Sequence, residues 1–288
     1  MTPREDERGM ILVNVLMIVA IAAGLVLLMI NREELGLDRA LRLREASRAM
    51  AVARGGELSA LVALRRDAET APDADYRAEA WGRVAENGVP IAGGTFDLAI
   101  ADAEGRFNLN MLRSGEAGAV IRFTDIGHQV GLSDDQIVKL TQLVRLTGPV
   151  TDLRPLRFVG VDPRIAAQLE RLVTALPGDT SINLNAADQE MLAVLFHDPL
   201  VAERLVKARE RQGFLTPKDL TDNQLEQPVG TSFKSNTFWV RTRATIGMTS
   251  QQLATLVQRR GKDEEAEAVP VARWRNAAVP PGAPAFGS

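Results

Sequence analysis

Hydrophobic and polar positions divide the chain into an apolar start, a long amphipathic stretch, two β-rich parts and a helical middle. Met10 to Ile30 is 21 residues long, and Asn14 is its only polar side chain. At about 1.5 Å per helical residue the segment covers roughly 31 Å, the thickness of a bilayer's hydrocarbon core. The pattern predicts a transmembrane helix over residues 10–30.

The helical pattern continues beyond this apolar segment. Apolar residues recur close to the i, i+3, i+4, i+7 spacing of one helix face, at Leu37, Ala40, Leu41, Met50, Ala53, Leu61 and Leu64. Charged side chains fill most of the positions between them. We therefore expect one long helix that begins apolar and becomes amphipathic, followed by a polar loop or frayed helix end at residues 67–80.

The first β-rich part follows this helix. Residues 81–84 are expected to form a strand, residues 86–95 (ENGVPIAGGT) a loop, and residues 95–101 a half-buried strand. A turn at 102–105 would then use Gly105 for a positive φ. Residues 106–112 would return as a second strand or pack as a loop.

The second β-rich part lies near the C-terminus. FWVRTRATIG, after Thr237, is rich in aromatic and β-branched residues and predicts a strand. Thr249, with Gln252 three residues later, predicts a capped helix that ends before Gly261. VPVARWRN is expected as a last strand, and the Pro/Gly-rich tail from Ala277 is expected to be disordered.

Helix start signals fill the middle of the chain. Ser133 and Gln136 form a capping-box pattern for a helix over about 134–146. Further caps are predicted at Asp162-Pro163, Asn185, Asp198-Pro199 and Thr216-Pro217. The order of elements predicts an α+β fold in which a β-rich element is interrupted by an all-helical insertion.

Composition narrows the candidate chemistry. The chain has 288 residues, a formal net charge of −3, two histidines and no cysteine. Disulfides and thiolate sites are therefore excluded, and no strongly basic or acidic balance points to nucleic acid. Ser-His-Asp order, H-E-x-x-H and Gly-rich phosphate loops are not found, so we expect no enzyme.

The N-terminus resembles that of type IV pilins and pseudopilins, which have a charged leader, a Gly and an apolar helix. Here the leader is MTPREDERG, ending at Gly9. The resemblance implies cleavage by prepilin peptidase between Gly9 and Met10, and methylation of Met10. Most members of the family carry Glu at the fifth mature position, which is Asn14 here. The class that usually lacks this Glu is the minor pseudopilin K of type II secretion.

A second segment resembles the K class more specifically. DAEGRFNLN, residues 102–110, is similar to the D-x-x-G-(R/K)-(F/I/L)-N-(L/V)-N segment of these proteins. The resemblance implies a single-pass inner-membrane protein with a periplasmic domain, at the tip of the pseudopilus, where it helps to initiate assembly. Expected partners are the I-, J- and H-type minor pseudopilins, the major pseudopilin, prepilin peptidase and the inner-membrane secretion platform.

The expected organisation follows from these patterns and the resemblance. More arginines follow the apolar segment than precede it, so a simple positive-inside count favours an N-terminus outside the cytoplasm. The resemblance to pilins implies instead a cytoplasmic N-terminus, which we adopt. The parts are a leader at 1–9, a transmembrane helix at 10–30, a pilin-like helix with the first strands at 31–114, a SAM-like or helix-hairpin-helix-like insertion at 115–235, the returning β element at 236–276 and a disordered tail at 277–288.

Two candidate sites in the middle of the chain are weak. K-class proteins often bind calcium on an acidic loop, but the matching stretch VRLTGPVTDLRPLRFVGVDP offers only Asp152 and Asp162, so we expect no cofactor. Asp102, Glu104, Asn108 and Asn110 suggest a metal loop or, more simply, a turn built from side chains that bond nearby backbone.

Residues 185–220 resemble a helix-hairpin-helix module, and a membrane-anchored DNA-uptake receptor is the alternative function. DNA-binding hairpins place glycines between the helices, whereas this turn reads His197-Asp198-Pro199. Six acidic residues also outnumber five basic ones over this stretch, which leaves no basic footprint for DNA. We expect no nucleic-acid partner.

Overall fold

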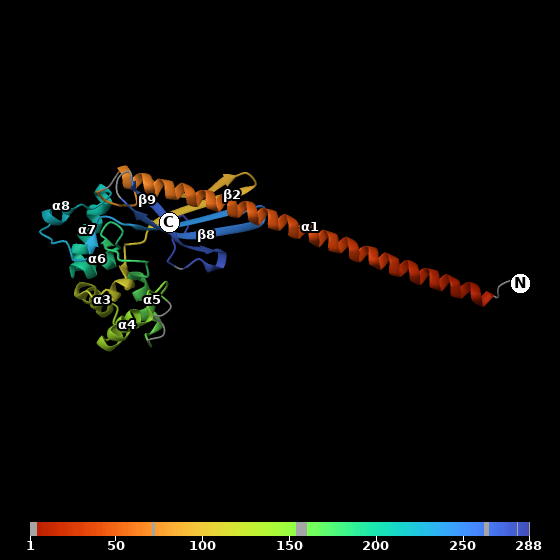
Figure 1. Cartoon of the computed structure of the whole chain (residues 1–288), viewed down its shortest axis with the longest axis horizontal. Helices are drawn as coiled ribbons and strands as arrows, with labels where there is room; N and C mark the ends of the chain where they lie inside the picture. The colour runs from red at the N-terminus through yellow and green to blue at the C-terminus, as the bar shows by residue number, and fades with distance from the viewer. Residues whose placement is uncertain (1–4, 71–72, 154–159, 262–264, 281, 288) are drawn as a thin grey trace.

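The structure is a computed structural model that describes residues 5–70, 73–153, 160–261, 265–280 and 282–287, with side chains from Leu12 onward. Residues 1–4 of the expected leader lie outside this description. Helix α1 (Glu5–Thr70) is continuous over 66 residues, roughly 100 Å at 1.5 Å per residue. Its first half projects from a globular head (Figure 1). The prediction of one long helix is confirmed.

A five-stranded antiparallel sheet forms the centre of the head. The strand order is β1-β2-β7-β8-β9. The bounds are β1 (Glu86–Ile91), β2 (Gly94–Asp102), β7 (Thr237–Ile246), β8 (Thr249–Arg260) and β9 (Glu267–Arg275). The strands predicted at 95–101, after Thr237 and at VPVARWRN are confirmed.

The second half of α1 packs closely on this sheet because its buried face is made mostly of small residues. Ala49, Ala53 and Ala60 are completely buried. At Gly56 an added Cβ would lie 2.3 Å from the ring of Phe96 on β2, so only glycine allows the helix this close. The helix therefore covers one face of the sheet along much of its length (Figure 1).

A helical subdomain is inserted between two neighbouring strands. β2 and β7 pair directly, with Asp102 opposite Phe238, and the chain between them leaves the sheet and returns to it. This subdomain contains β3 (Phe107–Asn108), η1 (Leu109–Arg113), α3 (Ala117–Gln129), α4 (Asp134–Thr147), α5 (Pro163–Leu172), β4 (Val173–Thr174), β5 (Ile182–Asn183), α6 (Gln189–Phe196), α7 (Pro199–Gln212), α8 (Pro217–Asp222) and β6 (Thr231–Ser232). It has a hydrophobic core separate from the core between α1 and the sheet. Figure 1 places its helices at the end of the head away from the N-terminus.

Most of the predicted helix caps in this subdomain are confirmed. Ser133 forms a capping box with Gln136, and Asp162 and Asp198 each accept backbone N–H groups at the start of α5 and α7. Thr216 begins α8. The prediction at Asn185 is wrong, because α6 begins after Asp188 and Asn185 has a different role.

The predictions for residues 81–95 are wrong in two places. The expected strand at 81–84 is a short helix, α2 (Ala80–Arg83), which buries Trp81 edge-on against Phe238 at 5.2 Å between ring centroids. The expected loop at 86–95 contains β1. This strand tolerates Gly88 and Pro90 because it lies at the edge of the sheet, where ladder hydrogen bonds are needed on one side only.

The helix predicted from Thr249 is strand β8. A two-residue turn at Gly247-Met248, with Gly247 at φ +56°, sends the chain back along β7. β8 pairs on both sides and is covered on both faces, by α1 and by the cluster around Trp239 and Trp274, so it lacks the alternation of a half-buried strand. Tertiary pairing therefore overrides a local capping pattern.

The C-terminal tail has a defined path where the structure describes it, although its composition predicts disorder. A short 3-10 helix, η4 (Asn276–Ala278), follows β9. The ring of Phe286 then lies 4.5 Å from both the Arg241 and the Arg243 guanidinium groups of β7. The carbonyl oxygen of Pro284 accepts a hydrogen bond from Arg241 at 2.9 Å.

Candidate functional site

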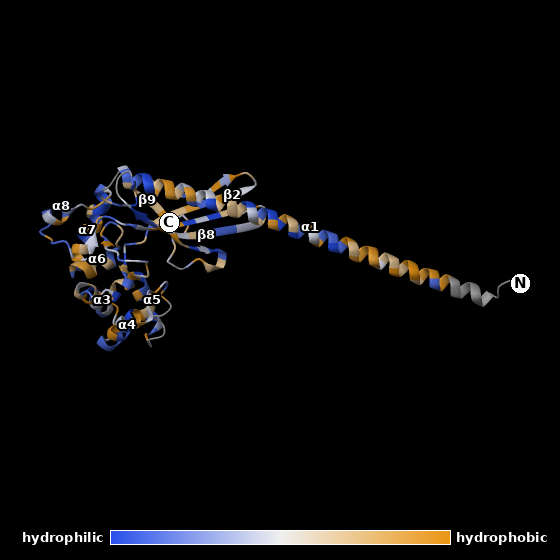
Figure 2. Cartoon of the chain, viewed as in Figure 1, coloured by the Kyte–Doolittle hydropathy of each residue, from blue (hydrophilic) through white to orange (hydrophobic). Residues whose placement is uncertain are grey.

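The projecting half of α1 exposes an apolar surface that the head does not cover. Every residue from 12 to 44 is exposed, including Leu12, Val13 and Ile18 at 62–63%. Figure 2 shows this half as a mostly hydrophobic rod. Within the described residues, α1 is the one helix long and apolar enough to cross a membrane, and none of its most apolar window is buried. This surface needs a lipid or protein environment.

The predicted processing and assembly residues lie on this rod. Gly9 and Met10 fall within the bounds of α1, at positions where side chains are not described. Asn14 is exposed in the isolated chain, among apolar neighbours. A polar side chain at this depth needs a hydrogen-bond partner once it enters hydrocarbon, and its own helix or an adjacent helix would supply one.

The segment that resembles the K class connects the end of β2 to the helical subdomain. Asn108 Oδ1 accepts the N–H of Asn110 at 3.1 Å and the N–H of Leu176 at 3.0 Å. Asn110 forms a reciprocal pair with the backbone of Val150: Nδ2 donates to the Val150 carbonyl, and the Val150 N–H donates to Oδ1, both at 2.9 Å. The prediction of a turn built by side chains is confirmed, but these asparagines also bind segments that are distant in the sequence.

The same device occurs a second time at Asn183-Leu184-Asn185. Asn183 Oδ1 accepts the N–H of Asn185 at 2.9 Å. Asn185 then forms a reciprocal pair with the backbone of Leu215, donating at 3.1 Å and accepting at 2.6 Å. Each Asn-Leu-Asn turn also follows a two-residue parallel ladder, whose second residue is the first asparagine of the turn: Asn108 pairs with Thr174 and Asn183 with Ser232. The same Asn-Leu-Asn motif thus links distant segments of the helical subdomain at two places, and the sequence shows it as a repeated N-L-N.

The glycine of the first motif has a steric role instead of the predicted conformational one. Gly105 is not among the residues with positive φ. An added Cβ there would lie 2.5 Å from the carbonyl oxygen of Ala186. Glycine is therefore required because the two turns approach each other closely at this point.

A buried polar junction joins the helical subdomain to the sheet. Asn183 Nδ2 donates to the Asp75 carbonyl at 3.0 Å, to Asp102 Oδ2 at 2.8 Å and to Ser235 Oγ at 2.9 Å. The Ser235 hydroxyl donates to Asp102 Oδ2 at 2.6 Å, and Glu104 Oε1 accepts the N–H of Asn236 at 3.1 Å. Burial raises the pKa of Asp102 to about 6 and the pKa of Glu104 to about 7. The junction thus fixes the points where the chain leaves and re-enters the sheet.

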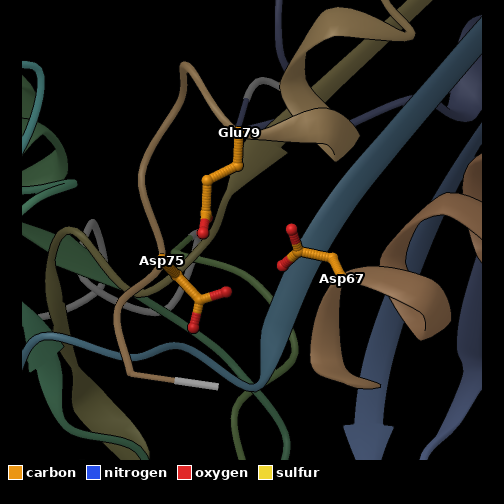
Figure 3. Close-up of side chains that lie close together, drawn as sticks. All are labelled: Asp67, Asp75 and Glu79. Carbon is orange, nitrogen blue, oxygen red and sulfur yellow. The ribbon is translucent and has the colours of Figure 1, made fainter. Parts of the chain in front are cut away.

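Three acidic side chains beside this junction lie close enough together to be a candidate metal site. Asp67 at the end of α1, Asp75 and Glu79 bring one carboxylate oxygen each within 4.8 Å of one another. Figure 3 shows the three carboxylates turned toward one another, with Glu79 above Asp75 and Asp67 to its right. Desolvation raises the pKa of Asp67 to about 6 and the pKa of Glu79 to about 7.

An arginine, Arg259, balances the negative charge of two of these carboxylates. The Arg259 guanidinium forms ion pairs with Asp67 and with Asp75. Glu79 accepts hydrogen bonds from the indole N–H of Trp81 at 2.9 Å and from the N–H of Tyr76 at 2.8 Å. A calcium ion needs six to eight oxygen ligands. In this cluster the Arg259 guanidinium already supplies the positive charge that the carboxylates require. The arrangement fits a structural ion-pair cluster better than a metal centre.

The helical hairpin has no free site for a nucleic-acid phosphate at its turn. Asp198 Oδ1 accepts the N–H groups of Leu200 at 2.7 Å and Val201 at 3.4 Å, so a carboxylate occupies the N-terminus of α7. His197 adopts the left-handed conformation with φ 53° in place of a glycine. A phosphate would have to displace the chain's own anion.

Comparisons with known proteins find a curated relative and a solved structure that are similar to this chain over most of its length. No protein-family model matches the chain. The type II secretion system protein K of Pseudomonas aeruginosa is 29% identical over 306 residues, covering 90% of this chain and 91% of the relative. One chain in the crystal structure of the GspK-GspI-GspJ complex of the enterotoxigenic Escherichia coli type 2 secretion system superposes with a TM-score of 0.64 at 20% identity, covering 83% of this chain and 99% of that one.

These similarities extend over nearly the whole chain and include both the sheet and the helical subdomain. The structural likeness confirms the α+β fold with a long apolar N-terminal helix. The sequence likeness agrees with the family resemblance that the N-terminus and the DAEGRFNLN segment had indicated. In sequence and in fold, the chain is thus similar to the K-class minor pseudopilins of type II secretion.

Proposed function

We propose that this chain is a minor pseudopilin that caps the tip of a type II secretion pseudopilus and helps to start its assembly. The observation that carries the proposal is the position of the helical subdomain. It is inserted between β2 and β7 and lies at the end of the head away from the N-terminus (Figure 1). About 120 additional residues there would clash in a tightly wound shaft but have free space at its end.

Asn14 supports the same position. A carboxylate at the fifth mature position would be buried in lipid and would need the N-terminal amine of a neighbouring subunit as its partner, since an unpaired buried charge costs several kcal/mol. A subunit at the very end of the filament has no further neighbour to supply that amine. Asn14 is neutral and tolerates the absence of this partner at a lower cost in free energy.

The proposed cellular arrangement follows from α1. Prepilin peptidase removes the leader after Gly9 and methylates Met10, and residues 10–30 then anchor the chain in the inner membrane with the head in the periplasm. The long exposed apolar rod supports packing against the helices of other pseudopilins within the filament. The partners are the I-, J- and H-type minor pseudopilins, the major pseudopilin and the inner-membrane secretion platform.

The role we propose is structural and uses no bound cofactor. Beside the junction, Arg259 forms ion pairs with Asp67 and Asp75. Glu79 accepts hydrogen bonds from Trp81 and Tyr76. Asp162 caps α5 through the N–H of Arg164 at 2.7 Å, which accounts for one of the two acids in the stretch that matches the family's calcium loop. Residues 154–159 of that stretch lie outside the described residues.

Copy number tests the proposal. Pseudopili are assembled with the native set of pseudopilins, sheared, sorted by length and quantified by mass spectrometry against isotope-labelled peptides. A tip subunit gives one copy per filament at every length, so its ratio to the major pseudopilin falls as filaments lengthen. A constant ratio at all lengths would place the protein in the shaft and contradict the proposal.

A further inference from the structure

A shallow cavity lies on the outer side of the head, between α1 and the edge strand β9. Its volume is about 310 Å³, and it is lined by Arg54, Glu57, Leu58, Leu253, Arg273 and Arg275. Among the strands that the structure describes, β9 pairs with β8 alone, so this edge of the sheet is unpaired. The cavity is open to another molecule, since Arg54, Leu58 and Arg275 on its wall are exposed.

Positive charge is in excess in this cavity. Glu57 is 4% exposed, and its Oε1 accepts hydrogen bonds from Thr255 Oγ1 at 2.6 Å and from Arg273 Nε at 2.7 Å. This ion pair holds Arg273 in place. Arg54 and Arg275 are exposed and form no ion pair within the described part of the chain. Three guanidinium groups thus surround a single carboxylate, which leaves the cavity with donors for an anion.

Apolar side chains continue from the cavity along α1. Leu58 is 61% exposed and Val62 is 41% exposed. Arg54, Leu58 and Val62 follow one another at i, i+4 spacing, so they form a single ridge on the helix surface. Large apolar side chains beside unpaired arginines are typical of the central part of a protein interface.

Distance excludes the membrane as the source of the anion. Arg54 lies 24 residues beyond Ile30 on one continuous helix, roughly 36 Å along its axis. The surface potential of anionic lipids decays within about 8 Å at physiological ionic strength. Lipid head groups therefore do not reach the cavity, and an occupant must come from the same compartment as the head.

We propose that this cavity and the Arg54-Leu58-Val62 ridge dock an acidic-aliphatic segment of a neighbouring minor pseudopilin of the I or J type. One carboxylate of the partner pairs with Arg54 and Arg275, and its aliphatic side chains cover Leu58 and Val62. The identity of the partner rests on the proposed function. The acidic and aliphatic character of the docked segment follows from the charge and the exposed apolar surface of the cavity. The site is distinct from the apolar rod, which contacts other helices through its hydrophobic residues.

The test uses the full-length chain in detergent micelles, titrated with full-length I- and J-type pseudopilins. The variant is Arg54→Glu combined with Arg275→Glu, since both side chains are exposed and their exchange leaves the core intact. Arg273 is kept, because its loss would leave the buried Glu57 without its charged partner. The matched control is Arg113→Glu with Arg164→Glu, two exposed arginines of the helical subdomain.

The expected result is a loss of affinity of at least tenfold for the cavity variant and less than twofold for the control. Leu58→Ala, an exposed position, should weaken binding by about three- to tenfold with no change in the unfolding transition. Equal binding by the wild-type chain and the cavity variant would overturn the docking site while leaving the proposed function intact. A wild-type chain that forms no complex would contradict both the occupant and the proposed function.

Discussion

Asn110 and Val150 lie 40 residues apart in the chain and form two reciprocal hydrogen bonds, each 2.9 Å long. The side-chain amide acts as a peptide group would in a β-ladder, and its Nδ2 also donates to the Leu176 carbonyl at 2.8 Å. The pair joins three segments in the interior of the helical subdomain. This buried amide therefore helps to hold the helical subdomain rigid, as a subunit that caps a filament requires.

Asn110→Ala should lower the free energy of unfolding by about 2–3 kcal/mol, because it leaves the buried N–H and carbonyl groups of Val150 without the partner that Asn110 supplies. The Leu176 carbonyl loses one hydrogen bond but keeps the one from Asn108 Nδ2 at 3.2 Å. Asn223→Ala is the control, because the side chain of this exposed residue donates to the carbonyl of Asp219 in the adjacent helix α8, and its effect should stay within about 0.5 kcal/mol. Urea unfolding followed by tryptophan fluorescence measures both. Equal stability of the two variants would contradict the role given to Asn110.

The buried acids predict how stability depends on pH. Folding raises the pKa of Glu79 and Glu104 from 4.5 to about 7, and the pKa of Asp67 and Asp102 from 3.8 to about 6. Between about pH 4 and pH 7 the folded state therefore binds protons that the unfolded state has released. The free energy of unfolding falls as pH rises through this window and levels off above it.

Thermal unfolding at pH 5 and pH 8 measures this dependence, and the melting temperature should be higher at pH 5. Glu104→Gln should reduce the difference, because an amide keeps the acceptor for Asn236 and removes the titration. Glu69→Gln, at an exposed position on α1, should leave the difference unchanged. A melting temperature that rises from pH 5 to pH 8 would mean that these carboxylates are not held in a desolvated junction.

Processing of the N-terminus is predicted at a single bond. N-terminal sequencing of the protein purified from membranes should begin at Met10, with a methylated amine. Gly9→Val should leave a precursor longer by nine residues that does not enter pseudopili, because the peptidase needs a small residue at the cut. A mature chain that starts at Met1 or beyond Ile30 would contradict the pilin-like interpretation of α1.

Chelator should have little effect on the head. Since Arg259 supplies the positive charge between Asp67 and Asp75, we expect EDTA to change the melting temperature by less than about 1 °C, within the error of the measurement. Arg259→Gln is the informative comparison, because it leaves two buried carboxylates without their partner and should be strongly destabilising. A large calcium-dependent rise in the wild-type melting temperature would show that the chain holds a metal.

The long helix and most of the caps of the helical subdomain could be predicted from the sequence because their signals are local. A long apolar run with Asn14 as its only polar residue predicts the first part of α1. Ser133, Asp162 and Asp198 bond backbone groups two or three residues away. Strand β8 could not be predicted in this way. Its Thr249-to-Gln252 pattern is typical of a helix start, but pairing with β7 and β9 decides its conformation.

The junction was only partly predictable for a similar reason. The local half of each Asn-Leu-Asn turn follows from the tendency of asparagine to bond nearby backbone. The long-range half, in which Asn183 contacts Asp75, Asp102 and Ser235, depends on which segments the fold brings together. The repetition of N-L-N at 108–110 and 183–185 is the sequence signal that points to a shared structural role.

The position of the helical subdomain in the assembled pseudopilus tests the central claim most directly. Because the chain contains no cysteine, Asp222→Cys on the exposed surface of α8 gives a single site for a gold label. Electron microscopy of labelled pseudopili should show one particle per filament, at its end. Particles spaced regularly along the shaft would contradict the account.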